Sequence, residues 1–373
     1  MEIARVEVYH VVMKLKEPFE TSFGRVVDRH GVLVKVVDSS ECVGWGEAPV
    51  DEGPWYSYET VETTLYVYRE FLIPKLLKLG SLEHPREFIE AVESVRGYRM
   101  AKAGIEMALW DLKARLESKP LYKLLGGVRN YVVSGVSIGV IGDEAALLKA
   151  VAKFLDEGYK RIKIKIKPGW DAHPVKLIRK EFGNIPLQVD ANAAYTLAHV
   201  SVFKELDNYS LLMVEQPLSH EDLHDHAELQ RQIKTPICLD ESIKSIHDVK
   251  AALRLSSCRV INVKPARVGG LHESKQIHDY TMSRGFPIWI GGMLETGIGR
   301  GHLVAIATLP NVKYPCDISG SNRYWEEDIV EPPWTVKRDG TIRVPEKPGI
   351  GVEVIEERLG KYVKNKIEFK RTV

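Results

Sequence analysis

The feature that most constrains the fold is a set of short apolar segments that recur at a regular interval from residue 130 onward. There are eight of them: VVSGVSIGV, RIKIKIK, IPLQVDA, LLMVEQP, TPICLDE, CRVINVKP, FPIWIGGM and VKYPCDIS. The interval has room for one strand, one helix and two loops, and apolar strands separated by helical stretches are typical of a parallel sheet. The pattern therefore predicts an α/β fold of the (β/α)8 TIM-barrel type, in which the last helix is hard to place.

The chain before these repeats is organised differently. Two strand-like segments, IARVEVYHVVMKL and HGVLVKVVDSSECVGWGEA, precede three segments with helical spacing. We therefore expect an N-terminal α+β domain over residues 1–127 and the barrel over residues 128–325. Residues 326–373 have the pattern of a hairpin and loops, and we expect this tail to pack back on the N-terminal domain and complete it.

Composition narrows the possible partners. The 373 residues carry 52 basic and 51 acidic side chains, so the charge balance gives no reason to expect a nucleic-acid or membrane partner. No apolar run is long enough to span a bilayer, and MEIARVEVYHVVMKL lacks a signal-peptide pattern, so a cytoplasmic location is expected. The four cysteines form no CxxC pair and are expected to be reduced core residues.

Acidic residues stand at the ends of three consecutive predicted strands. Asp190, Glu215 and Asp240 follow one another at equal intervals, and Lys264 follows Asp240 after nearly the same interval. In barrels of this kind the active site lies at the carboxyl ends of the strands, so these side chains should share one rim. Three carboxylates without His or Cys suit a hard cation, Mg²⁺ first and Mn²⁺ second. One such acid alone would more often cap the next helix, but three in register argue against that explanation.

The segment RIKIKIK places three lysines on one face of a predicted strand: Lys163, Lys165 and Lys167. Taken alone, this pattern is typical of a strand with a solvated basic face. Inside a parallel barrel neither face is freely solvated, and a buried ammonium is costly unless it is paired or has a lowered pKa. Repulsion between Lys163 and Lys165 is expected to lower the pKa of at least one of them, as a general base requires. Lys167 precedes Pro168 and is expected to lie beyond the rim.

A further lysine, Lys264, belongs to the sixth strand, about half the barrel circumference from the second strand. Lysines on two sides of a cavity, with a metal at its edge, suit the removal of a proton α to a substrate carboxylate. In such a site the metal would neutralise the enediolate and one lysine would take the proton.

Together these motifs resemble the enolase superfamily and, within it, the muconate-lactonizing-enzyme subgroup. The resemblance covers essentially the whole chain and is carried by KIK (163–165), VDANAAY (189–195), VEQPL (214–218), LDES (239–242), NVKPARVGG (262–270) and GGMLETGIGR (291–300). It implies a capping domain, formed by the N-terminal unit and the C-terminal tail, over the barrel mouth. It also implies the three carboxylates as metal ligands, Lys165 as the acid/base residue supported by Lys163, and Lys264 on the opposite face.

Three further segments, GWGEAPVDEGPWYSYET, PGWD and KPARVGG, are similar to the branch that contains o-succinylbenzoate synthases and N-succinylamino acid racemases. In that branch two cap loops, here residues 18–25 and 51–58, close over the non-reacting end of the substrate, although plain connecting turns would also explain them. Arg267 resembles an arginine beside the second lysine, with a surface salt bridge as the alternative. The other substrate-binding or supporting candidates are Asn192, Ser137, Phe19, Ser22, Gly292, Met293 and Asp317.

Two departures argue against other members of the superfamily. The eighth strand has Asp317 but Ser319 where dipeptide epimerases carry Asp-x-Asp, which argues against a substrate with a free dipeptide amine. The segment GGMLETG occupies the place of the His base of the mandelate-racemase subgroup, which argues against sugar-acid dehydratases. Its glycines would instead let the backbone approach the substrate.

The resemblance implies a syn dehydration that gives o-succinylbenzoate in menaquinone synthesis. Lys165 would take the proton and then protonate the leaving hydroxyl, while Lys264 stays cationic. The same two lysines would racemise N-succinylamino acids. The alternatives are a muconate-type cycloisomerase, a dipeptide epimerase and a non-catalytic barrel. The expected partners are a small carboxylate substrate and further copies of the chain in a homo-oligomer, without nucleic acid or membrane.

Overall fold

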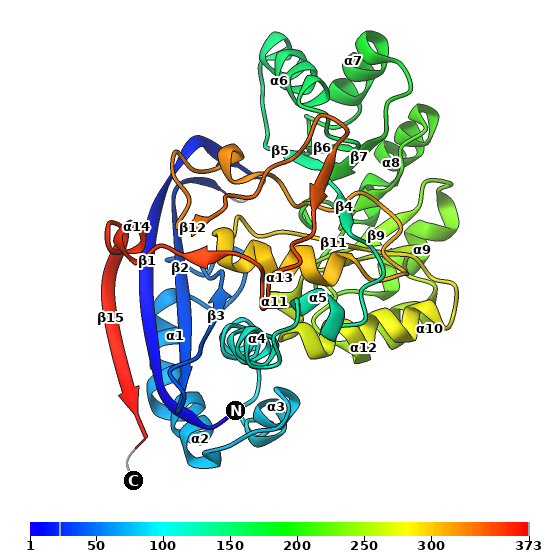
Figure 1. The fold of residues 1–373 in the computed structure, drawn as a ribbon. Helices are drawn as coiled ribbons and strands as arrows, with labels where there is room; N and C mark the ends of the chain where they lie inside the picture. Colours follow the sequence, from blue (N-terminus) through cyan, green and yellow to red (C-terminus); the bar gives the residue numbers. More distant parts are fainter. Residues whose placement is uncertain (22–23, 372–373) are drawn as a thin grey trace.

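The N-terminal part of the chain forms an antiparallel sheet, because apolar side chains alternate along its long strands. The computed structural model describes residues 1–21 and 24–371, and its first sheet has the order β15-β1-β2-β3. The strands are β1 (Ile3–Glu20), β2 (Arg25–Asp38), β3 (Val43–Ala48) and β15 (Val363–Lys370). The C-terminal strand β15 therefore pairs with β1 and completes the N-terminal domain, as expected from the sequence (Figure 1). The exact domain boundaries stay a prediction.

Helices cover one side of this sheet (Figure 1). Those in contact with the strands are α1 (Val61–Val67), α2 (Ile73–Leu79) and α4 (Arg99–Leu116), and the π-helical turn η1 (Tyr68–Leu72) joins the first two. Helix α3 (Arg86–Ala91) packs on α2 and α4, and α5 (Leu121–Leu124) packs between α4 and the barrel helix α13. Helix α4 lies against β3 at two glycines. A Cβ atom on Gly46 would lie 2.1 Å from the carbonyl oxygen of Gly104, and one on Gly44 would lie 2.2 Å from that of Ala108. The GWG segment of the sequence is thus required for this backbone contact.

The second part of the chain forms a parallel sheet with the order β11-β10-β9-β8-β7-β6-β5. Its strands are β5 (Val136–Ile138), β6 (Ile162–Lys165), β7 (Leu187–Asp190), β8 (Val214–Glu215), β9 (Ile237–Leu239), β10 (Val260–Val263) and β11 (Ile288–Ile290). The helices that follow them are α6 (Glu144–Asp156), α7 (Ala172–Phe182), α8 (Val200–Leu206), α9 (His224–Gln232), α10 (Ile246–Leu255), α12 (Leu271–Met282) and α13 (Gly297–Ala307). The alternation is that of a TIM barrel, as predicted.

The eighth predicted strand, VKYPCDIS, closes the barrel without forming a regular strand. It makes one parallel bridge to β11, between Val312 and Ile288, and another to the first strand region, between Cys316 and Ser134. Pro315 interrupts it, because proline has no N–H for a ladder hydrogen bond. The segment is followed by the 3-10 turn η4 (Ser321–Arg323) in place of the usual helix.

Two other segments differ from the simplest expectation. The first predicted barrel strand, VVSGVSIGV, is divided: β4 (Tyr131–Val133) pairs with β13 (Thr341–Arg343) outside the barrel, and only β5 lies in it. The tail also contributes β12 (Val330–Glu331), β14 (Glu353–Val354) and α14 (Glu356–Gly360). The short elements α11 (Pro265–Val268), η2 (Leu197–His199) and η3 (Asp207–Tyr209) complete the chain. Across the described part, no helix combines the length and apolar character needed to cross a membrane.

Buried carboxylates join the two domains. Glu47 on β3 accepts hydrogen bonds from the backbone N–H groups of Thr296 (3.1 Å) and Gly299 (3.0 Å) at the start of α13. Glu106 on α4 accepts hydrogen bonds from Leu271 and His272, both at 2.8 Å, at the start of α12. Burial raises the pKa of each of these two carboxyl groups to about 7, and the hydrogen bonds oppose that rise. Each cap carboxylate thus meets the positive end of a barrel helix.

The contact between β3 and α4 leads to the first prediction. Gly46→Ala should lower the free energy of unfolding by about 1–3 kcal/mol, because the new methyl group meets backbone atoms that cannot move separately. Urea unfolding measures this change. Gly142→Ala is the matched control, since a Cβ there meets nothing within 4 Å and should change the unfolding free energy by less than about 0.5 kcal/mol. Equal stability of the two variants would contradict the packing described for β3 and α4.

Candidate active site

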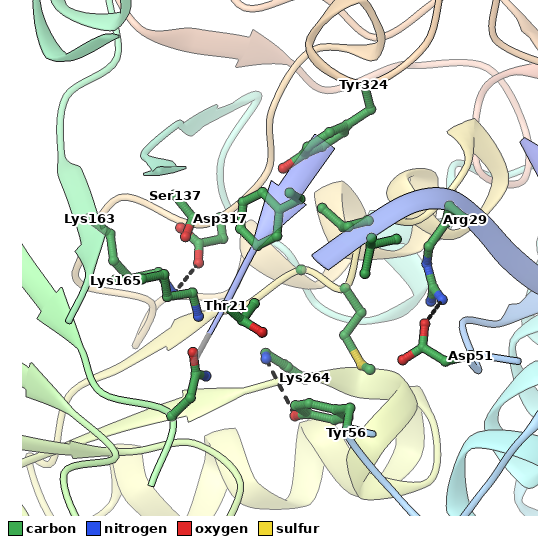
Figure 2. Close-up of a pocket in the computed structure, with 16 residues that line it drawn as sticks. Thr21, Arg29, Asp51, Tyr56, Ser137, Lys163, Lys165, Lys264, Asp317 and Tyr324 are labelled. Atoms are coloured by element: carbon green, nitrogen blue, oxygen red, sulfur yellow. Dashed lines mark hydrogen bonds and ion pairs between the residues drawn. The ribbon is translucent and has the colours of Figure 1, made fainter. Parts of the chain in front are cut away.

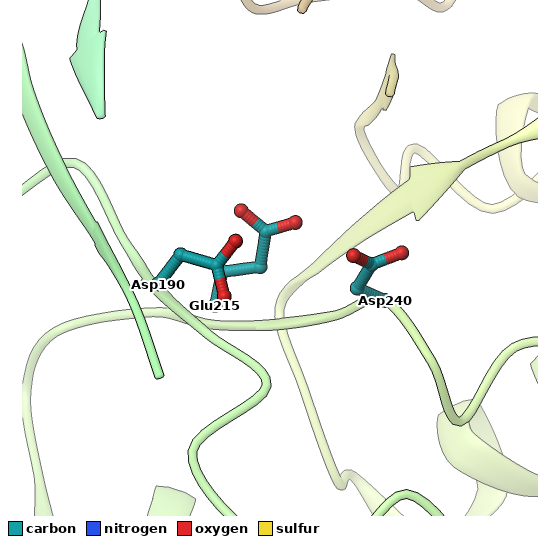
Figure 3. Close-up of side chains that lie close together, drawn as sticks. All are labelled: Asp190, Glu215 and Asp240. Carbon is teal, nitrogen blue, oxygen red and sulfur yellow. The ribbon is translucent and has the colours of Figure 1, made fainter. Parts of the chain in front are cut away.

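Three neighbouring strands bring the predicted acidic residues together at the barrel mouth. Asp190 at the end of β7 is paired in register with Glu215 at the end of β8, and Asp240 directly follows β9. All three are buried, and one oxygen from each lies within 4.8 Å of the others (Figure 3). We call these three residues the carboxylate triad. The regular spacing in the sequence thus becomes a single cluster.

Each member of the triad has an ammonium group beside it. Lys165 Nζ lies 2.6 Å from Asp190 Oδ2, Lys163 Nζ lies 2.8 Å from Glu215 Oε2, and Lys264 Nζ lies 2.9 Å from Asp240 Oδ2. Buried negative charges at such short separation are unfavourable without nearby positive charge. The three lysines supply part of this positive charge from the cavity side.

The donor set fits a divalent cation. Three carboxylates offer oxygen ligands only, which is the chemistry that Mg²⁺ prefers. Asp240 Oδ2 is buried and, apart from its ion pair with Lys264, accepts no hydrogen bond of regular geometry from the described residues, so it keeps lone-pair capacity for a metal. The triad can therefore hold a metal ion, and its identity as Mg²⁺ is a proposal.

Nearby charged groups change the pKa values of Lys163 and Lys264. Burial alone would lower the pKa of Lys163, but Asp317, Glu215 and Asp190 outweigh it and raise that pKa above its usual value. Burial is likewise outweighed at Lys264, whose pKa is raised by Tyr56 and nearby carboxylates. The lowered pKa expected from lysine–lysine repulsion is thus not found at Lys163, because carboxylates from three other barrel segments surround its ammonium group.

A cavity lies between the cap and the barrel mouth (Figure 2). The sequence candidates that line it are Lys163, Lys165, Lys264, Phe19, Ser137, Asn192, Gly292, Met293 and Asp317. Phe19 and Thr21 come from the first cap loop, and Asp51 and Tyr56 from the second, so both expected loop segments reach the cavity. Ser22 lies outside the described residues.

Arg267 lies behind the triad and is not a surface residue. Its side chain is buried and contacts Asp240 Oδ1, and its Nη1 lies 3.1 Å from the Tyr56 hydroxyl. Its Nε and Nη2 donate to the carbonyl oxygens of Ile243 and Asn262, both at 2.7 Å. The alternative of a surface salt bridge is therefore wrong, and Arg267 supports a triad carboxylate.

Some cavity residues were not identified from the sequence. Arg29 on β2 pairs with Asp51 in the second cap loop, and the Tyr56 hydroxyl lies 3.3 Å from Lys264 Nζ. Tyr324 reaches the cavity from the turn after the eighth segment. No spacing rule connects these residues, because they meet only when the cap covers the barrel. Glu241, by contrast, stands in the LDES motif, and it accepts a hydrogen bond from Asn192 Nδ2 at 2.9 Å.

Comparison with known proteins agrees with this architecture. Residues 3–126 match the N-terminal domain of the mandelate racemase / muconate lactonizing enzyme family, and residues 146–358 match the enolase C-terminal domain-like family. The chain is 47% identical to an o-succinylbenzoate synthase of Geobacillus kaustophilus, over 100% of this chain and 99% of that protein. It is 43% identical to an N-succinylamino acid racemase of Amycolatopsis sp., over 98% and 99%. A crystal structure of an enolase-superfamily member from Listeria innocua superposes with a TM-score of 0.96, at 38% identity and complete coverage of both chains.

The triad leads to a prediction about metal binding. Mg²⁺ should stabilise the folded protein by about 2.7 kcal/mol when its concentration is about 100 times the dissociation constant, and EDTA should reverse the effect. Thermal unfolding with increasing MgCl₂ measures it. Asp240→Asn should lose most of this stabilisation, because it removes one charged ligand. Asp51→Asn, a cavity carboxylate on the cap, is the control and should keep it; an equal loss in both variants would argue against the triad as the metal site.

Proposed function

The chain belongs to the mandelate racemase / muconate lactonizing enzyme family of the enolase superfamily, and on this premise we propose that it removes a proton α to a substrate carboxylate. The proposed reaction is that of an o-succinylbenzoate synthase, with N-succinylamino acid racemisation as a second activity of the same site. Its setting would be menaquinone synthesis in the cytoplasm.

One observation carries the proposal. Lys165 on β6 and Lys264 after β10 reach into one cavity from different sides (Figure 2). Each of them pairs with a carboxylate of the triad. The triad would hold Mg²⁺, with Mn²⁺ as the second choice. When bound, the cation would supply positive charge to the substrate carboxylate and so make its α-proton more acidic.

The two lysines would have different roles. Lys165 makes one ion pair among the described residues, with Asp190, and its head group lines the cavity. It would take the α-proton and then protonate the leaving hydroxyl on the same face, which gives a syn dehydration. Lys264 Nζ lies 2.9 Å from Asp240 Oδ2 on another side of the cavity. As a cation, it would stabilise the negative charge that develops on the substrate.

Racemisation needs the same groups with one change. A proton removed by one lysine must be replaced on the opposite face by the other, so each lysine would act as the base for one enantiomer and as the acid for the other. Both proposed substrates carry a succinyl group, and the same cap loops would cover it. The similarity to one relative named as the synthase and to another named as the racemase supports keeping the two activities together in the proposal.

Two other reactions of the superfamily are less well supported. Muconate-type cycloisomerisation needs the same metal and lysine, so it remains the second candidate. A dipeptide epimerase would need a carboxylate free to bind a substrate ammonium. Here Asp317 is already paired with Arg161 at 2.6 Å and with Lys163 at 2.6 Å, which disfavours that role.

Lys165 provides the direct test of the chemistry. Lys165→Ala should reduce turnover of either substrate by about 10³-fold or more, because it removes the proposed acid/base group. Lys167→Ala is the matched control from the same run of lysines and should keep near-normal turnover. Both variants should first be shown to be folded by circular dichroism. Substantial turnover by a folded Lys165→Ala protein would disprove the mechanism.

The substrate is tested by a separate assay. The purified protein with Mg²⁺ should dehydrate the cyclohexadiene carboxylate precursor of o-succinylbenzoate, followed by absorbance, and racemise N-succinylamino acids, followed by polarimetry. Muconate should give little or no lactone. Turnover of muconate alone would replace the proposal with the cycloisomerase alternative, and inactivity toward all three would favour a non-catalytic barrel.

A further inference from the structure

Arg161 is a buried cation that the proposed chemistry does not use. It lies two residues before Lys163, immediately before β6, and its side chain is 1% exposed. Residues two apart on a strand point to the same side, so Arg161 and Lys163 share the barrel interior. Gly135 on the neighbouring segment makes room for it, since a Cβ there would lie 2.7 Å from the guanidinium. A buried charge kept at this steric cost calls for an explanation.

Arg161 contacts the eighth barrel segment and the side chain of Trp289 on β11. Its Nη2 donates to Asp317 Oδ1 at 2.6 Å and to the carbonyl oxygen of Pro315 at 3.0 Å. Its guanidinium lies 4.9 Å from the ring centre of Trp289. The Nε and Nη1 groups have no hydrogen-bond acceptor among the described residues. The electron-rich ring face of Trp289 is the compensating contact, so the unpaired groups do not indicate a separate ligand.

Asp317 connects Arg161 to Lys163, which lines the cavity. Its other oxygen, Oδ2, lies 2.6 Å from Lys163 Nζ. Lys163 Nζ in turn lies 2.8 Å from Glu215 Oε2 and 3.3 Å from Asp190 Oδ2. Positive and negative side chains therefore alternate from Arg161 through Asp317 and Lys163 to the triad. Lys163 is held by three carboxylates.

We propose that Arg161 is a positioning residue: it fixes Asp317, which holds Lys163 against the carboxylate triad and leaves Lys165 as the lysine available for proton transfer. This inference depends on the proposed function, because it assigns Arg161 a part in that reaction. Without Arg161, Asp317 would lose both its orientation and its second cation. Lys163 would then be free to approach Asp190, which is the carboxylate paired with Lys165.

The chain offers a control that separates positioning from support of the fold. Arg129 anchors the start of the same eighth segment, by donating to the carbonyl oxygens of Val312 and of Pro310 just before the segment, both at 3.0 Å. No ion pair connects it to Asp317 or to the triad in the described part of the chain. Arg161 and Arg129 thus both hold the eighth segment. Of the two, only Arg161 pairs with Asp317, which in turn pairs with Lys163.

The test compares the steady-state kinetics of three variants with wild type at saturating Mg²⁺. Arg161→Met should lower kcat by about 10- to 100-fold with KM changed less than about threefold, as is usual when a residue supporting a reactive group is removed. Arg161→Lys, which can still pair with Asp317, should recover most of kcat. Arg129→Met should lower the melting temperature but keep kcat. Normal kcat in Arg161→Met, or an equal loss in Arg129→Met, would overturn the proposal.

A double-mutant cycle tests the route through Asp317. In an Asp317→Asn background, Arg161→Met should lower kcat by less than about threefold, because the link that it breaks is already gone. A full loss in that background would overturn the proposed route. The double variant also removes both charges together, so it remains informative if Arg161→Met alone fails to fold. If wild type turns over no substrate the proposed function fails, whereas normal wild-type and Arg161→Met turnover reject this inference alone.

Discussion

The carboxylate triad is the constraint on which the rest of the structure depends. Asp190, Glu215 and Asp240 are buried with oxygens within 4.8 Å of one another, so the barrel mouth must supply positive charge to balance these carboxylates. It does so with lysines from β6 and from the end of β10, and with Arg267 behind Asp240. The same groups that balance the triad are those proposed to act on the substrate. In this site, therefore, a change to one of these cations would alter both the charge balance of the triad and the proposed chemistry.

The cap is held where it can cover this charged mouth. Glu47 binds the start of α13, and the residues just before that helix include Gly292 and Met293, which line the cavity. Glu295 in the same loop accepts a hydrogen bond from the Met293 N–H at 2.8 Å. A single cap strand, β3, thus sets the position of a substrate-facing loop of the barrel.

The regularly repeating features of the structure could be predicted from the sequence. Strand and helix alternation predicted the barrel, and the equal spacing of the acids placed the triad at one rim, because equal intervals in a parallel barrel end at equal heights. The pairing of Arg29 with Asp51, and the place of Tyr56 beside Lys264, could not be predicted, since they depend on how the cap docks. The irregular structure of the eighth segment could not be predicted either, because Pro315 interrupts its strand pairing.

The two lysines of KIK show the same limit most clearly. Lys163 and Lys165 lie on the same face of one strand in the sequence pattern, and each stands between two isoleucines. Barrel closure makes them different, because it brings Asp317 from the eighth segment against Lys163, whereas the one ion pair of Lys165 among residues 1–21 and 24–371 is with Asp190. The number of carboxylates around each ammonium is set by strands far away in the chain. The division of roles between the lysines therefore arises from the closed barrel, in which Arg161 and Asp317 are as much a part of the site as the motif itself.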